Sequence, residues 1–123
     1  MLKDPKTFKE ELKRRIYQFV LNLIKFIYTL PQNDSFCKIA IGQLLRCGTS
    51  IGANYIEAIA GSSKKDFTNF LAISLKSANE SKFWLALLRD TGKGHRDEIE
   101  KLLKELIEIS NILASSIRTL RSK

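Results

Sequence analysis

The stretch Gly42–Glu57, GQLLRCGTSIGANYIE, decides the expected fold because its polar residues recur at helical spacing. They follow one another at steps of three or four positions, as Gln43, Arg46, Ser50, Asn54 and Glu57. On a helix this spacing forms one polar stripe. The remaining positions are apolar or small, and each of Gly42, Gly48 and Gly52 would weaken an isolated helix by up to about 1 kcal/mol relative to alanine. We therefore expect neighbouring helices to cover most of this helix, with the glycines permitting close backbone approach.

The polar stripe has two interpretations. It is either a hydrogen-bond network inside a helical bundle or the lining of a binding surface. A buried Arg46 requires a carboxylate partner, and Glu57 and Glu80 are the candidates. The predicted buried network consists of Gln43, Arg46, Ser50, Asn54, Glu57 and Glu80.

Length and composition indicate one domain spanning residues 1–123, with a formal net charge of +8. Cys37 and Cys47 stand ten positions apart on one predicted helix, too far along its axis to form a disulfide, so we expect both to be buried thiols in a reducing compartment. The N-terminus is charged and lacks the apolar core of a signal peptide. The most apolar run, residues 16–30, is shorter than the roughly twenty residues of a membrane span. These features predict a cytoplasmic protein that does not bind membranes.

Helix signals divide the chain into four segments, at about residues 5–30, 35–60, 64–90 and 96–120. Helix starts are indicated by Asp4 before Pro5, by Asp34 and by Ser63. Gly61 and the turn Thr91–Gly94 mark breaks. Because no segment alternates with a period of two, the chain is predicted to be all-α, an up-down-up-down antiparallel four-helix bundle.

The first predicted helix carries more apolar surface than one core needs. Beside its main apolar stripe runs a second one, formed by Tyr17, Leu21, Ile24 and Tyr28. This surplus has two explanations: it forms the interface of a homo-oligomer, or the bundle core and a covering loop bury it.

The predicted topology gathers basic residues at one end of the bundle. Eleven basic side chains, including Lys3 and Lys123, meet five acidic ones there, which accounts for six of the eight net positive charges. A helix dipole disfavours lysines at the start of a helix, so their position favours phosphate binding. The candidate nucleic-acid-binding residues are Lys6, Lys9, Lys13, Arg14, Arg15, Lys64, Lys65, Arg118 and Arg121. Because no exposed aromatic residues are expected among them, we predict recognition of backbone and shape.

Motifs for catalysis or metal binding are not found in the sequence. His95 is the only histidine, and with two distant cysteines it does not match the spacing of zinc ligands. The run Gly48–Gly52 lies within a helical pattern and lacks the lysine of a phosphate loop. We therefore predict a protein that is not an enzyme and that has no cofactor and no metal.

The assembled motifs resemble the four-helix-bundle proteins encoded in intervening sequences of bacterial large-subunit ribosomal RNA genes. They are Leu30-Pro31, Gln43 with Arg46, the run TSIGANYIEA at residues 49–58, Lys65-Asp66-Phe67, Lys76 with Ala78 and Glu80, and Phe83-Trp84-Leu85. This family is similar to the accessory protein of diversity-generating retroelements. The resemblance implies a homopentamer that binds nucleic acid, with a reverse transcriptase as a further partner.

Two functions follow as hypotheses. The first is a homo-oligomeric protein that binds structured RNA, in preference to DNA, through the basic end. The second is a protein-interaction scaffold that docks a partner such as a reverse transcriptase through the first helix.

Overall fold

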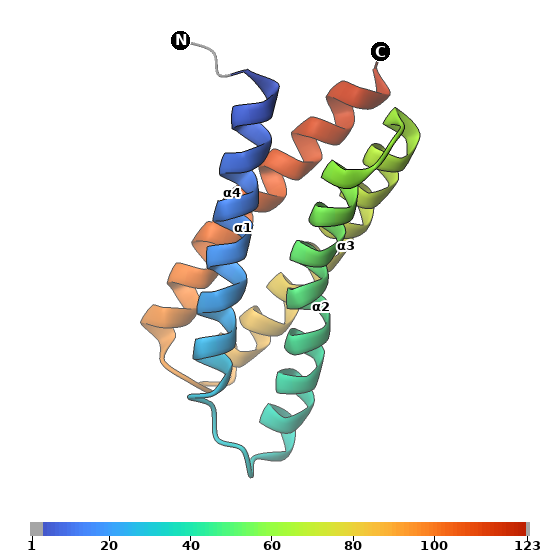
Figure 1. Cartoon of the computed structure of the whole chain (residues 1–123). Coiled ribbons are helices and arrows are strands. Elements are labelled where there is room, and N and C mark those ends of the chain that lie inside the picture. Colours follow the sequence, from blue (N-terminus) through green and yellow to red (C-terminus); the bar gives the residue numbers. More distant parts are fainter. Residues whose placement is uncertain (1–3, 123) are drawn as a thin grey trace.

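The computed structural model describes residues 4–122, which form four α-helices and, within that range, no strand. The helices are α1 (Pro5–Ile27), α2 (Ser35–Ala60), α3 (Lys64–Asp90) and α4 (Arg96–Arg121). Consecutive helices run in opposite directions, and α1 packs against both α2 and α4, so that the four helices close a ring (Figure 1). The predicted antiparallel four-helix bundle is confirmed.

Local side-chain caps set the starts of three helices. Asp4 accepts a hydrogen bond from the Thr7 amide at 3.0 Å, and Asp34 accepts one from the Cys37 amide at 2.9 Å. Ser63 accepts one from the Asp66 amide at 3.0 Å. Each bond satisfies a backbone donor that lacks a partner within its helix. These three starts agree with the sequence prediction, and α4 begins after His95, whose side chain makes no cap bond.

The end of α1 differs from the prediction, because the helix stops at Ile27 and not at Leu30. The amides of Thr29 and Leu30 bond to carbonyls three residues earlier, at 2.9 and 3.1 Å, in a tighter turn. Pro31 disfavours helical backbone at the residue before it. The apolar pattern continues through Leu30, which is buried, although the helix does not.

The core takes apolar side chains from all four helices. Tyr55 of α2 is almost completely buried, and its hydroxyl donates to the Lys9 carbonyl of α1 at 2.9 Å. Burial raises the pKa of Tyr55 to about 12. Cys37 and Cys47 are buried free thiols, as predicted.

The interface between α2 and α3 is made of small side chains. Ser74, Ala78 and Ser81 are fully buried there. The Ser74 hydroxyl donates to the Ile51 carbonyl at 2.8 Å, and the Ser81 hydroxyl lies 3.1 Å from the Cys47 sulfur. These two helices make the most extensive contact of any pair in the bundle.

The three glycines of α2 differ in their surroundings. A Cβ atom at Gly48 would collide with the Leu23 side chain of α1, so this glycine permits the predicted close approach. One at Gly52 would make ordinary contacts, at 3.7 Å, with Ile16 and Val20. Gly42 has nothing within 4 Å of that position, and for this residue the packing prediction is wrong.

Candidate nucleic-acid interface

One end of the bundle carries the first turns of α1, the α2–α3 connection and the last turns of α4 (Figure 1). We call it the basic end. The predicted nucleic-acid-binding residues located there are exposed, apart from the half-buried Lys13 and Arg15. Seven of them make no ion pair with any residue in the range 4–122: Lys6, Lys9, Lys13, Arg14, Lys65, Arg118 and Arg121. Lys3 and Lys123, counted there from the sequence, lie outside the described residues.

Arg15 does not belong to this group of unpaired cations. Its Nε atom lies 2.7 Å from Glu105 Oε2, and its Nη2 atom lies 2.8 Å from Glu108 Oε1, so it bridges α1 and α4. Hydrogen bonds to both carboxylates raise the pKa of Arg15. Phosphate binding by Arg15 stays a prediction, and its charge is already paired within the bundle. No local pattern in the sequence indicates this bridge, because its partners are about ninety positions away.

A cavity of about 750 Å³ opens at the basic end, mainly between α1 and α4. Its walls include Phe8 and Leu12 of α1, Phe67 and Leu71 of α3, and Ile112 and Leu120 of α4. Phe8 is 42% exposed, and Lys9 Nζ lies 4.7 Å from the centre of the Phe67 ring. The expectation that the basic residues lack exposed aromatic neighbours is therefore wrong. Helix packing brings together rings that are far apart in the sequence.

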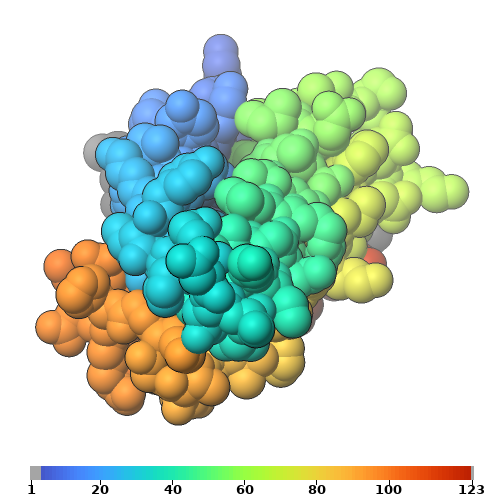
Figure 2. All heavy atoms as spheres, turned by 90° about the horizontal axis from the view of Figure 1, so that it is seen from below, coloured from blue at the N-terminus to red at the C-terminus, as the bar shows by residue number. Residues whose placement is uncertain are grey.

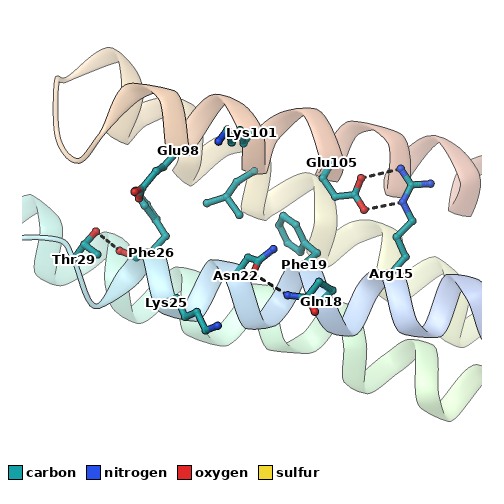
Figure 3. Close-up of a pocket in the computed structure, with 11 residues that line it drawn as sticks. Arg15, Gln18, Phe19, Asn22, Lys25, Phe26, Thr29, Glu98, Lys101 and Glu105 are labelled. Carbon is teal, nitrogen blue, oxygen red and sulfur yellow. Dashed lines mark hydrogen bonds and ion pairs between the residues drawn. The ribbon is translucent and has the colours of Figure 1, made fainter.

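A second cavity, of about 590 Å³, lies farther along the same interface of α1 and α4 (Figure 3). Arg15 lines both cavities, so its bridge to Glu105 stands between them. Phe19, Phe26 and Leu102 supply apolar lining, and the Gln18 amide donates to Asn22 at 2.9 Å. The α1–α4 interface is thus open on both sides of one charged bridge.

The polar stripe of α2 forms a network on the surface and not inside the bundle. The Arg46 side chain is 58% exposed, pairs with Glu80 of α3 and donates to Gln43 at 2.7 Å. Ser77 donates to Ser50 at 2.9 Å, and Asn54 donates to the same Ser50 hydroxyl at 2.9 Å.

The predicted burial of this network is therefore wrong, because α2 and α3 pack through their neighbouring small residues. Glu57 is exposed and takes no part in the network among the described residues. Because the Arg46–Glu80 pair stays hydrated, it does not incur the desolvation cost that a buried arginine would need a carboxylate to offset.

The second apolar stripe of α1 is left open by the bundle. Tyr17 is 68% exposed and Tyr28 is 73% exposed, while Leu21 and Ile24 are half-buried. Neither the core nor a loop among residues 4–122 covers the two tyrosines. A groove of about 630 Å³ between α1 and α2 adjoins Tyr17. That a second copy of the chain covers this face stays a prediction.

At the opposite end of the bundle, three basic residues are paired, while Lys38 has no ion-pair partner among residues 4–122. Lys93 Nζ lies 2.8 Å from Asp34 Oδ1 and joins the α3–α4 connection to the start of α2. Arg89 pairs with Asp90 at 2.9 Å, and Arg96 with Glu100 at 3.8 Å. Figure 2 looks onto this end, where the α1–α2 connection lies against the start of α4. The bonds from Lys93 and from the Cys37 amide lower the pKa of Asp34 to about 2.

Within residues 4–122, no cluster of three or more potential metal ligands is present. No helix in that part of the chain is long and apolar enough to cross a membrane. His95 is exposed at the start of α4.

These features define a small all-helical bundle protein with a basic end and an opposite end where three of the basic residues form ion pairs. The model of the family described as 23S rRNA-intervening sequence protein matches residues 9–115, and the chain belongs to this family.

A solved structure gives the same fold. It is a crystal structure of a protein with unknown function from the S23 ribosomal protein family of Bacteroides thetaiotaomicron, 34% identical, covering 89% of this chain and 97% of that one, with a TM-score of 0.81. No curated protein matches the sequence. The similarity to the retroelement accessory protein stays a prediction.

Proposed function

We propose that the protein binds nucleic acid, structured RNA in preference to DNA, through the basic end, without catalysing a reaction. One observation carries the proposal: seven cations at this end lack ion-pair partners among residues 4–122, whereas Arg89, Lys93 and Arg96 at the opposite end are paired and Lys38 there is not. Phosphates would supply the missing negative charge. The family description, 23S rRNA-intervening sequence protein, makes ribosomal RNA the first ligand to test. The proposal includes a location in the cytoplasm of bacteria.

The test is binding of a folded ribosomal RNA fragment over a salt series. The variant Lys6→Gln, Lys13→Gln, Arg14→Gln removes three cations that lack partners at the basic end. The matched control, Lys38→Gln, Lys76→Gln, Lys104→Gln, removes three exposed lysines elsewhere and changes the net charge equally. Lys9 and Arg15 are left intact because they contact Phe67 and Glu105.

We expect the first variant to bind more weakly and with a shallower salt dependence, by about 0.7–0.9 in the log–log slope for each lost phosphate contact. The control variant should keep the slope of the native protein. Equal slopes for both variants would mean that only overall charge matters and would contradict a specific basic end. Failure of the folded native protein to bind at low salt would overturn the proposal.

We also propose that the open stripe of α1 joins copies of the chain into a homo-oligomer, a pentamer by the resemblance. The exposure of Tyr17 and Tyr28 supports this proposal. Molar mass from light scattering tests it: Tyr17→Arg with Tyr28→Arg should yield monomers, whereas Phe83→Arg, on α3, should not. A monomeric native protein would contradict self-association and favour the alternative, a scaffold whose α1 docks a partner such as a reverse transcriptase.

A further inference from the structure

The cavity at the basic end combines an accessible aromatic ring with hydroxyl groups. Phe8 is 42% exposed at its wall, and Phe67 stands on the α3 side. Across from them, α4 contributes the hydroxyls of Ser115, Ser116 and Thr119. The cavity, of about 750 Å³, falls within the range of 300–1,000 Å³ that is usual for small-molecule sites. A planar group with polar edges matches this combination of ring and hydroxyls.

Positive charge lies around the same cavity. Lys9 lines it and lies over the Phe67 ring, at 4.7 Å from the ring centre. Arg15 is the other cation in the lining, and it is paired with Glu105. Glu11 is the only acidic residue in the lining. A ligand in the cavity would therefore meet an aromatic surface and the Lys9 ammonium group.

We propose that this cavity receives one unstacked base of a single-stranded nucleic acid, stacked on Phe8, while Lys9 and the unpaired cations elsewhere at the basic end bind the flanking phosphates. The proposal rests on the proposed function and specifies its ligand as a strand with unpaired bases. Single-strand binding sites combine aromatic platforms with a basic groove, and stacking on a ring is tolerant of base identity. An apolar peptide would fill the walls, but it would leave the unpaired cations Lys6 and Arg118 without partners. Recognition should be weakly sequence-specific, since hydroxyls both donate and accept hydrogen bonds.

The experiment compares Phe8→Leu with the native protein at low salt. Leucine keeps an apolar side chain at this half-exposed position but removes the ring. The matched control is Phe83→Leu, the same substitution at a ring that is 57% exposed near the other end of α3. The three labelled probes are a short single-stranded RNA, a fully abasic strand of the same length and a duplex of the same sequence.

We expect Phe8→Leu to weaken binding of the single-stranded RNA by about 5- to 100-fold, the range found for loss of one base–aromatic stack. The abasic strand and the duplex should be affected less than about twofold, because neither offers a free base. Phe83→Leu should bind all three probes as the native protein does. Unchanged melting temperatures for both variants establish that the fold is intact.

Two other results separate this inference from the proposed function. If Phe8→Leu leaves single-strand binding unchanged, or weakens all three probes equally, base stacking at the cavity is refuted while phosphate binding stands. If the native protein binds none of the probes and does not bind the folded ribosomal RNA fragment either, both proposals fail.

Discussion

The α2–α3 and α1–α4 interfaces are built from helices of similar length but are packed in opposite ways. Fully buried serines and an alanine let α2 and α3 approach closely, and serine hydroxyls bond across the contact. Between α1 and α4, the Arg15 bridge stands between two cavities of about 750 and 590 Å³. The first interface is filled by small buried side chains, whereas the second leaves room at the end where the unpaired cations lie. This difference separates a structural half of the bundle from its candidate binding half.

The largest expected effect comes from enlarging a serine at each interface. Ser81→Leu inserts methylenes into a filled contact and removes the hydrogen bonds of Ser81, so we expect a loss of about 2–4 kcal/mol in the free energy of unfolding. Ser116→Leu points into the cavity at the basic end and should change stability by less than about 0.5 kcal/mol. Urea denaturation of both variants measures the difference. Similar losses at the two positions would show that the α1–α4 interface is not open in solution.

An intermediate effect is expected from removing the bridge between the two cavities. Arg15→Gln should lower the free energy of unfolding by about 1 kcal/mol, because half-exposed ion pairs with Glu105 and Glu108 contribute only modest Coulomb energy. The loss should shrink in high salt, which screens exposed charges. The neighbouring Arg14→Gln, which removes a cation without a partner, serves as the control and should be close to neutral. A larger loss for Arg14→Gln than for Arg15→Gln would contradict the assigned bridge.

The smallest expected effect concerns acid. Because the folded pKa of Asp34 is about 2, below its value of 3.8 in the absence of partners, the carboxylate contributes stability above about pH 4, and this contribution disappears as the pH falls through 2. Asp34→Asn retains a capping side chain but removes the charge that meets Lys93. The melting temperature of the native protein should therefore drop more between pH 4 and pH 2 than that of the variant. Parallel acid profiles would show that the Lys93 pair contributes nothing.

Much of the fold follows from local patterns in the sequence. The caps formed by Asp4, Asp34 and Ser63 involve residues three positions apart, and apolar spacing identified the four helices that they begin. Even so, the end of α1 was predicted three residues too late. The apolar pattern continues to Leu30, which reaches the core from a turn and not from a helix.

The candidate site was predicted less completely, for a physical reason. The sequence located the basic residues at one end, because chain direction alone places the ends of antiparallel helices. It could not show that Arg15 is paired with Glu105 or that Phe8 and Phe67 share a cavity. It named Glu80 as a candidate partner of Arg46, but it could not show that this pair lies in solvent.

What the sequence by itself determined about this protein is its class: four amphipathic helices, three of them with side-chain caps, and a net charge of +8 gathered mainly at one end. Only the tertiary structure decided which cations are left without an ion-pair partner and which helix–helix interface contains cavities. Caps and periodicity arise from residues within one or two turns, so they are readable along the chain. Ion pairs and cavities between helices depend on how close the helices approach, and here the small residues at one interface and the Arg15 bridge at the other determine that distance.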